Sequence, residues 1–527
     1  MRIVRACALC CALLSAGACS LVIRDPFGDL GKTRAVLADK VSRADALEDL
    51  ETVVRLLDTV HAEPYRFRPR EALLAERRRA AEIMPASMTK GELCLRLSRV
   101  VAVLDDGHTS MECERLLMED WRRAAAASPP QMQRVLRFAP FMRLDDQQHL
   151  IVGWHGEATG VDPGDRLLRI NGQDVDVLLS EWAHEVSHDT DAGRRAQVAR
   201  RFRVYLALHG INAPYRLTVA APGAPSRDVT VEGDPVNYQF QDRPSQPPRP
   251  LPDITSLLRT RTPAVLGPIK VRTAFFTYRI LEPDVALVDF FSIFDGLDTV
   301  GRFKKAVDAL FKQIALDRPR ALVIDVRENG GGEDSASAEL LRHFTRKPFR
   351  LLASTQVKRS KEARDYGNSI VRIPFRWMGL PYLFADGRAY FSGKIGTLSR
   401  PAERPVKAHA AGEPFFAGPV CVLTGPHTFS AGSEFAEAVK AFGLATIMGE
   451  ETGGQPNSFG NQMPFWLPRS GLLIQIATVR GVRGGGSLTD NTAVMPDVVV
   501  RPTAEDIRSF FDPVLDRARS CPERSIQ

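Results

Sequence analysis

A serine in the last quarter of the chain has the surroundings of a nucleophile. Ser430 follows an apolar strand pattern at 420–424 and a short turn, and a helical pattern begins at Ala431. A serine at such a strand-to-helix junction exposes its hydroxyl, while the next amide and the helix start favour a developing negative charge. The spelling differs from the usual Gly-x-Ser-x-Gly elbow. The alternative interpretation is that Ser430 or Ser433 only caps the helix.

A glycine-rich segment offers amides for the same chemistry. The sequence DVRENGGG at 325–332 lies directly after an apolar strand pattern and directly before a helical one. Glycines there let the backbone approach a ligand and direct amides at an anion or oxyanion. Gly330 or Gly331, together with Ala431, would supply an oxyanion hole. A phosphate loop is disfavoured because no Gly-Lys-Ser or Gly-Lys-Thr follows, and a flexible turn is the structural alternative.

A base for the serine is offered by His108, within DDGHT at 105–109. It lies just past a predicted helix that begins near Ser87 or Thr89 and ends before the aspartates. An isolated histidine is more often structural, but one displayed on a loop is free to act as a base. His427 is a second candidate, although a neighbour on the same tight turn as the serine rarely points back at its hydroxyl.

A different chemistry is spelled by His184-Glu185-Val-Ser-His188, the H-E-x-x-H pattern of zinc proteases. On a helix both imidazoles would share one face, with Glu185 as base to a bound water. No Glu follows until Glu232, so the usual downstream ligand is missing, and His155 would be a distant third ligand. A zinc metalloprotease is therefore the alternative to the serine mechanism, and chance spacing on an exposed helix is the simpler interpretation.

These residues are distributed over several predicted modules. Apolar residues recur at three- and four-residue spacing in a helical module expected at 30–127. Short alternating strands separated by turns follow at 138–236, and a Pro-rich linker spans 237–263. From 264 to 510, apolar strands alternate with helices, which predicts an α/β layer structure.

The modules and motifs in combination resemble the C-terminal processing (tail-specific) and tricorn-core family of serine peptidases. The segment at 160–175 is itself similar to the PDZ domain, which binds a peptide's C-terminus as an added strand. The resemblance implies an α/β fold: a crotonase-like (ClpP/crotonase) catalytic core, an N-terminal helical module and a PDZ-like β-rich domain. It also implies a peptide or unfolded-protein substrate, and neither metal nor organic cofactor is expected.

Two subtypes of this family differ in the base that activates the serine. The processing branch uses a downstream lysine in a Gly-Glu-x-x-x-Gly-Lys segment. Here that place is occupied by Gln455, and no lysine occurs after Lys440. A glutamine amide cannot accept the serine proton, so this Ser-Lys dyad is excluded.

The tricorn-like branch uses a histidine of the helical module and an acid in a Glu-Asn-x-Gly-Val-x-Pro-Asp pattern. The segment DNTAVMPD at 490–497 is similar, with Asp for Glu and Ala for Gly. The resemblance thus implies Ser430 as nucleophile, His108 as general base and then acid, and Asp490 as orienter of the imidazole. Gly107 stands where this branch has a helper serine. An inactive, peptide-binding protein on the same scaffold is a further alternative.

The ends and the charge of the chain bear on location and partners. The first 18 residues are typical of a signal peptide, with Arg2 and Arg5, a short apolar run and small residues before Cys19. We expect export to the periplasm or cell envelope, with membrane anchoring if Cys19 is lipidated. In that compartment Cys94 and Cys113 can pair. The net charge of +7 comes from scattered residues, so no nucleic-acid partner is expected. The oligomeric state is left open.

Overall fold

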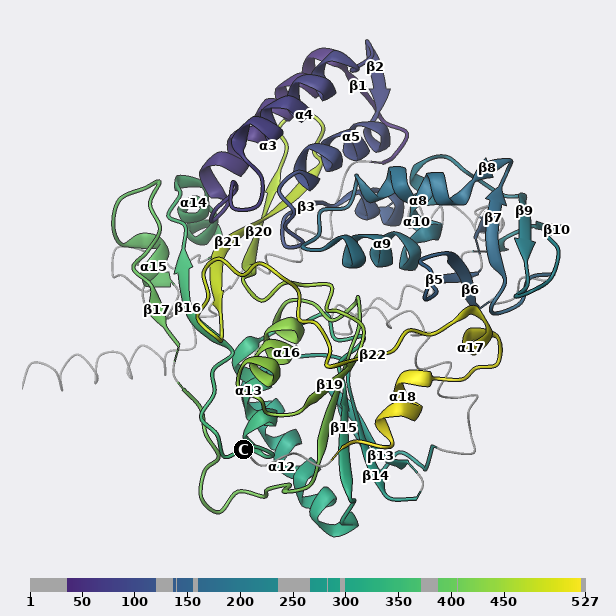
Figure 1. Ribbon diagram of the computed structural model, residues 1–527. Helices are drawn as coiled ribbons and strands as arrows, with labels where there is room; N and C mark the ends of the chain where they lie inside the picture. Colours follow the sequence, from purple (N-terminus) through teal and green to yellow (C-terminus); the bar gives the residue numbers. More distant parts are fainter. Residues whose placement is uncertain are drawn as a thin grey trace, which may run out of the picture.

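The computed structural model describes residues 36–119, 136–138, 140–154, 160–235, 266–281, 283–293, 299–370, 387–404 and 406–522. The expected signal peptide at 1–18, Cys19 and the Pro-rich linker at 237–263 lie outside these residues. The described part is a mixed α/β fold whose largest sheets have seven, six and five strands (Figure 1).

The seven-stranded sheet carries both chemical motifs at the ends of neighbouring strands. Its order is β12-β13-β14-β15-β18-β19-β22, parallel from β14 onward. The strands are β12 (Val271–Arg272), β13 (Phe276–Leu281), β14 (Val285–Phe290), β15 (Ala321–Asp325), β18 (Val420–Thr424), β19 (Thr446–Gly449) and β22 (Val498–Val499). Because β15 and β18 are adjacent and parallel, the loops that follow them emerge at the same edge of the sheet. The glycine-rich segment therefore lies beside the Ser430 turn.

Helices cover both faces of this sheet. One face packs against α12 (Thr299–Asp317), α13 (Asp334–Arg342) and α16 (Ala431–Ala441) in the largest apolar core. The other face packs against α18 (Pro513–Ala518) near the C-terminus. Every residue of β15 and β18 is buried, which explains their uninterrupted apolar sequences. The strands and helices expected around both motifs are confirmed.

A six-stranded antiparallel sheet has its own apolar core, separate from that of the seven-stranded sheet. Its strands are β5 (Phe141–Leu144), β6 (Leu150–Trp154), β7 (Arg166–Ile170), β8 (Gln173–Asp174), β9 (Tyr215–Ala220) and β10 (Arg227–Val231). The order is β10-β9-β7-β6-β5, so β5 is an edge strand. The accompanying helices are α8 (Val175–Ala183), α9 (Asp191–Arg200) and α10 (Phe202–Leu208).

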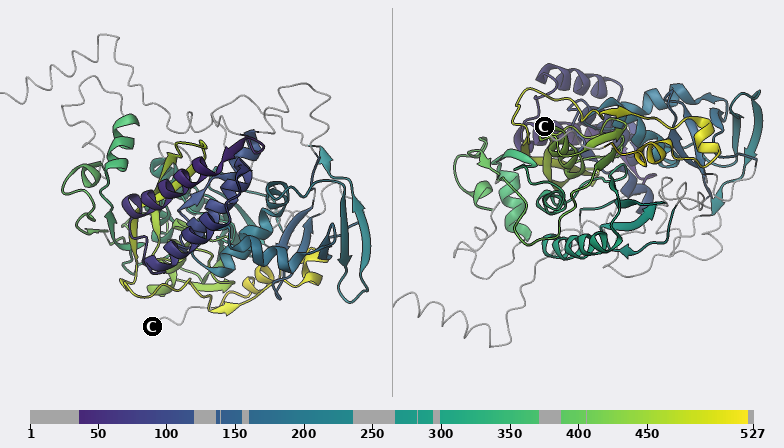
Figure 2. Two further views of the ribbon diagram at one scale, coloured as in Figure 1. Left: turned by 90° about the horizontal axis from the view of Figure 1, so that it is seen from above. Right: turned by 60° about the horizontal axis from the view of Figure 1, so that its bottom comes forward.

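The N-terminal helices share a core with a third sheet. They are α3 (Arg43–Val60), α4 (Arg70–Glu82) and α5 (Lys90–Ala102), with the short strands β1 (Lys40–Ser42), β2 (Ser87–Thr89) and β3 (Ser110–Met111). The third sheet has the order β17-β16-β21-β20, formed by β16 (Leu352–Val357), β17 (Ala402–Glu403), β20 (Phe459–Trp466) and β21 (Leu473–Arg483). Apolar residues of β21 belong to the core of the helices. Seen from above, the purple helices lie across the molecule with the six-stranded sheet beside them (Figure 2).

Covalent links tie two pairs of elements together. Cys94 of α5 is bonded to Cys113, as considered from the sequence, with a Cα–Cα distance of 5.7 Å. Cys421 of β18 is bonded to Cys521 just beyond α18, a pair that the sequence did not suggest. Within the described ranges, no helix is both long and apolar enough to cross a membrane.

Candidate active site

Ser430 stands on a tight turn between β18 and α16. Its backbone has φ 53° and ψ −129°, a conformation that side-chain-bearing residues rarely adopt. Such strain persists only where the surroundings enforce it and is common at functional sites. Here the Thr428 hydroxyl donates to the Val326 carbonyl at 2.8 Å, and the Phe429 amide donates to the Asn329 carbonyl at 3.0 Å. The turn before the serine is therefore fastened to the glycine-rich segment.

Ser433, the other serine of the motif, is fully buried and donates to the Thr428 carbonyl at 3.0 Å. Its hydroxyl is thus committed to holding the turn. The Ser430 side chain makes no capping hydrogen bond to its helix. The capping interpretation therefore does not account for Ser430.

The glycine-rich segment approaches the serine at Gly331. A Cβ at this position would lie 2.6 Å from the Ser430 Cβ and 2.9 Å from the Ala431 nitrogen, and its φ is +101°. Only glycine fits both conditions. The Gly331 amide already donates to Asn329 Oδ1 at 2.9 Å. Of the three expected oxyanion donors, this leaves the amides of Gly330 and Ala431 as the candidates.

His108 reaches the serine from the far N-terminal part of the chain. Its Nε2 lies 2.9 Å from Ser430 Oγ, across 322 positions of sequence. The imidazole is buried, and its ring stacks on Phe429 with centroids 4.6 Å apart. The structure thus brings together the expected nucleophile and base. His427 lines a separate cavity on the other side of the turn.

The loop that carries His108 is held to the five-stranded sheet by β3, the strand that follows it. β3 pairs antiparallel with β21, with Met111 opposite Ile474. The Gln462 side chain donates to the His108 carbonyl at 2.9 Å, and the Ala477 amide donates to Thr109 Oγ1 at 3.0 Å. These bonds fix the imidazole against a sheet that contributes no reacting group itself.

A buried carboxylate, that of Asp106, lies behind the imidazole. Asp106 Oδ1 accepts the His108 amide at 2.9 Å and lies 3.7 Å from His108 Nδ1. Its Oδ2 is 2.9 Å from His61 Nε2. Because the Glu63 amide donates to His61 Nδ1 at 3.1 Å, a neutral His61 carries its proton on Nε2 and donates it to Asp106. Sequence reasoning passed over Asp106, although an acid two residues before the histidine was a visible signal.

Charges around the imidazole favour its protonated form. Burial by itself lowers the pKa of His108, but Asp106 in the first place, then Asp189 and Glu434, raise it above its ordinary value. Burial would raise the pKa of Asp106, yet hydrogen bonds and charges from His108 and His61 hold it below its usual range. The site therefore contains an ionised acid that stabilises an imidazolium.

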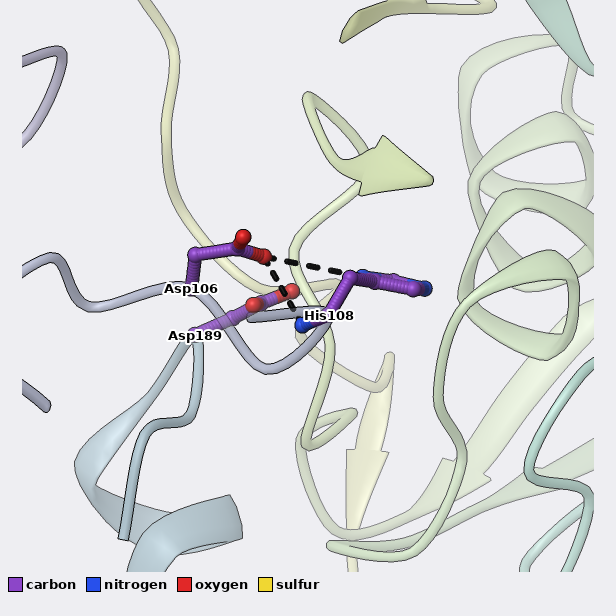
Figure 3. A group of neighbouring side chains, drawn as sticks. All are labelled: Asp106, His108 and Asp189. Carbon is purple, nitrogen blue, oxygen red and sulfur yellow. Dashed lines mark hydrogen bonds and ion pairs between the residues drawn. The ribbon is translucent and has the colours of Figure 1, made fainter. Parts of the chain in front are cut away.

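A second carboxylate, that of Asp189, faces the same histidine from the loop between α8 and α9 (Figure 3). It accepts the Gly107 amide at 2.8 Å and the Gln455 amide at 3.1 Å. Burial and the charge of Asp106 raise the pKa of Asp189 to about 7, against a lowering effect of His108. Sequence reasoning missed this residue, because it is brought to the site only by the fold of the six-stranded part.

Gly107 is explained by its surroundings. A Cβ there would lie 2.6 Å from the ring of Phe429, so the helper serine of the tricorn-like pattern does not fit at this position without moving that ring. The nearby polar group is instead Asp189, which binds the Gly107 amide.

Asp490, which the sequence predicts as the acid of the triad, is not brought to this group by the structure. Its carboxylate accepts the Thr492 amide at 3.0 Å and pairs with Arg483 Nη1 at 2.5 Å. The largest charge effects on the pKa of His108 come from Asp106, Asp189 and Glu434. The Asp490 side chain is 43 % exposed, whereas that of Asp106 is fully buried. The carboxylate of Asp490 is thus bound by Thr492 and Arg483, close to it in sequence.

The zinc-protease interpretation is wrong because its motif is not helical. Helix α8 ends at Ala183, so His184 is the C-cap residue and His188 lies on the following loop. Glu185 pairs with Arg99 at 3.0 Å rather than facing a metal-bound water. Burial lowers the pKa of His188 to about 3, with a nearby arginine acting in the same direction. The residues of the motif make contacts within the fold, such as the Glu185–Arg99 ion pair. The next residue, Asp189, faces His108.

Comparisons with known proteins bear on the family and the fold. Residues 285–500 match the family model of peptidase family S41. Mature CPAF complexed with lactacystin is similar in structure, with a TM-score of 0.60, 15% identity, and coverage of 89% of this chain and 96% of that chain. Mature CPAF alone has a TM-score of 0.58 and 16% identity, with coverage of 89% of this chain and 94% of that chain. The photosystem II D1 C-terminal processing protease has a TM-score of 0.39 and 16% identity, with coverage of 88% of this chain and 94% of that chain. A search of curated proteins found no significant match. At these identities, the likeness to CPAF shows the fold.

Proposed function

Because residues 285–500 form a domain of peptidase family S41 and the chain is a serine-type peptidase, we propose that it hydrolyses peptide bonds through Ser430, His108 and Asp106. The observation that carries this proposal is the 2.9 Å contact between His108 Nε2 and Ser430 Oγ on a strained turn. A contact of this length lies within direct proton-transfer reach.

The proposed reaction follows from the positions of these groups. Ser430 Oγ attacks the carbonyl carbon of the scissile peptide bond while its proton passes to His108 Nε2. For this, the neutral imidazole must carry its own proton on Nδ1, the nitrogen that faces Asp106. His108 then gives the proton to the departing amine, and water hydrolyses the acyl-enzyme by the same route. The amides of Ala431 and Gly330 would stabilise the oxyanion.

Asp106 takes the role that the sequence assigned to Asp490. Its lowered pKa keeps it ionised throughout the working range, and its contacts with His61 and the His108 amide fix its orientation. An ionised acid at this place selects the Nδ1–H tautomer and stabilises the imidazolium that forms.

We further propose that substrates are unfolded or C-terminal protein segments bound by the six-stranded part as a PDZ-like domain. A cavity of about 110 Å³ lies between this part and the loops that follow the strands of the seven-stranded sheet. It is lined by edge strand β5, by α9 and by the turn before Ser430. Arg143 and Arg200 contribute guanidinium groups, although Arg200 pairs with Glu328 at 2.9 Å and Glu450 also lines the cavity. An extended peptide can add to the open edge of β5, with its carboxylate near these cations.

The seven-stranded part would correspond to a crotonase-like core. Export to the periplasm or cell envelope is likewise a proposal, supported by the typical signal sequence and by two disulfide bonds, which persist in oxidising compartments. Lipidation at Cys19 would be tested by metabolic labelling with a palmitate analogue. Equal labelling of the wild type and Cys19→Ala would contradict it.

The test of the mechanism combines a fluorophosphonate probe with peptide hydrolysis. We expect the probe to label the wild type at Ser430, and we expect Ser430→Ala and His108→Gln each to lower kcat by on the order of 10⁴–10⁶-fold. Hydrolysis that survives Ser430→Ala would overturn the proposal. His427→Gln is the control for kcat only: His427 lies apart from the proposed reacting atoms but lines the cavity proposed for the substrate, so KM can change while kcat should not.

A further inference from the structure

We propose that Asp106, His108 and Asp189 form a reversible inhibitory binding site for a zinc ion behind the imidazole of His108. One ligand atom from each of the three lies within 4.8 Å of the others, and within the described ranges this is the only grouping of its kind. Figure 3 shows the two carboxylates on the same side of His108. The expectation that catalysis requires no metal is unaffected, because this ion would stop the reaction.

The key donor is the nitrogen of His108 that does not touch the serine. Nδ1 is buried and has no hydrogen-bond partner among the described residues, although the ring as a whole is held by Ser430 at Nε2. The residue is 7% exposed, and Nδ1 lies 3.7 Å from Asp106 Oδ1. An imidazole nitrogen that makes no hydrogen bond and lies beside two carboxylates can bind zinc once its proton has moved to Nε2.

The carboxylates are already oriented by other groups. His61 Nε2 donates to Asp106, and the amides of Gly107 and Gln455 donate to Asp189. Each carboxylate oxygen has lone pairs beyond those it uses in these bonds, so coordination need not displace them. Outer hydrogen bonds of this kind hold ligands in place and strengthen metal binding.

The dimensions and charges suit zinc rather than magnesium. Zinc takes N and O ligands at about 2.0–2.2 Å in a tetrahedron, which places neighbouring ligand atoms about 3.3 Å apart. The 3.7 Å between Asp106 and His108 is close to this spacing, and the widest pair must close by about 1.5 Å. Two carboxylates neutralise the dication. Magnesium prefers oxygen ligands and keeps its waters, so a site with an imidazole selects against it. Asp189 is partly exposed, whereas Asp106 and His108 are buried.

Bound zinc would block the proton transfer, a consequence that rests on the proposed function. A neutral imidazole has one proton for its two nitrogens. With zinc on Nδ1 the proton must sit on Nε2, where it points at Ser430 Oγ. The ring then donates to the serine and cannot accept its proton, so acylation stops until the ion leaves.

Binding is tested first, without relying on activity. The full-length Ser430→Ala variant is titrated with Zn²⁺ in competition with a chromophoric chelator, and one equivalent should bind. Adding Asp189→Asn should weaken this affinity at least tenfold, while His184→Gln, which alters the zinc-protease spelling at an exposed position, should not change it. Thermal unfolding shows that each variant folds. Absence of stoichiometric binding, or loss with His184→Gln but not with Asp189→Asn, would overturn the site.

Inhibition is tested second, on the wild-type enzyme. Zn²⁺ should abolish peptide hydrolysis, a chelator should restore it, and Mg²⁺ at the same concentration should have no effect. The Zn²⁺ concentration for half inhibition should rise at least tenfold in Asp189→Asn. Stoichiometric binding without inhibition would overturn the inhibitory role. Hydrolysis that survives Ser430→Ala would overturn the proposed function and leave the binding result standing.

Discussion

At the scale of single residues, the acid that we propose lies on a short loop rather than in the segment near the C-terminus. Asp106 and His108 are two positions apart, and the loop after α5 turns both inward so that one carboxylate meets the amide and the ring of the same histidine. Asp490 carries the family-like spelling but pairs with Arg483 and Thr492. The two candidates can therefore be separated by substitution.

Asp106→Asn should lower kcat by on the order of 10³–10⁴-fold, because an amide no longer selects the Nδ1–H tautomer or stabilises the imidazolium. Asp490→Asn is the matched control and should leave kcat within about threefold, since it removes only a partly exposed ion pair of small energetic weight. Steady-state kinetics on one peptide decides between them. A larger loss in Asp490→Asn than in Asp106→Asn would restore the assignment made from the sequence.

The acid limb of the pH profile reports the same carboxylate. His108 must be neutral to accept the serine proton, and Asp106 raises its pKa above the ordinary 6.5. We therefore expect kcat/KM to fall as pH decreases through an inflection above 6.5. In Asp106→Asn the residual activity should show this inflection at lower pH. An unchanged acid limb in that variant would mean that another group titrates.

Gly331→Ala tests the close approach of the glycine-rich segment. The new methyl would meet Ser430 Cβ at 2.6 Å and would require an unfavourable backbone at φ +101°. Displacement of the serine should lower kcat by about 10²-fold or more. Gly330→Ala is the control, because a Cβ there has nothing within 4 Å. Similar losses in both variants would show that the backbone of the segment, and not contact with Ser430, is critical.

At the scale of elements, strand β18 and helix α18 form a unit behind the nucleophile. Cys421 of β18 is bonded to Cys521, closing a loop with a sequence separation of 100, and α18 packs on the face of the sheet opposite α16. The bond between Cys94 and Cys113 closes a separation of only 19 within the N-terminal part. The longer loop restricts the unfolded chain more.

Replacing Cys421 and Cys521 by Ser should lower the free energy of unfolding by about 2–5 kcal/mol. Replacing Cys94 and Cys113 by Ser should also lower it, and we expect this second loss to be smaller than the first by about 1–2 kcal/mol. Denaturant unfolding followed by circular dichroism measures both. Equal losses in the two double variants would argue that buried packing around the cysteines, not loop closure, dominates.

At the scale of the whole molecule, the site is assembled from parts far apart in sequence. His108 follows the N-terminal helices, Asp189 comes from the six-stranded part, and Ser430 belongs to the seven-stranded sheet. The cavity with Arg143 lies between the latter two parts. The substrate site that we propose beside β5 and the proposed nucleophile Ser430 are therefore neighbours in space.

We expect a peptide with a free C-terminus to be cleaved with a lower KM than its C-terminally amidated form. Arg143→Ala should raise KM for the free form by about tenfold, corresponding to about 1.4 kcal/mol, with little effect on the amidated form. Lys270→Ala is a distant control that also removes one positive charge. Equal KM values for both peptides in the wild type would contradict carboxylate recognition in this cavity.

The sequence alone pointed to Ser430 and His108 as candidate nucleophile and base, to the glycine-rich segment and to the strands and helices around them, because each lies in a local pattern of apolar residues and turns. That β15 and β18 are parallel neighbours was not predicted from the sequence and is known only from the tertiary structure. Only the tertiary structure decided which acids face His108. Asp106 needed the direction of a loop, and Asp189 needed the contact between two modules, neither of which leaves a periodic signal. The H-E-x-x-H motif suggested a zinc site for the same reason. Its two histidines share one face only on a helix, and helix α8 ends at Ala183.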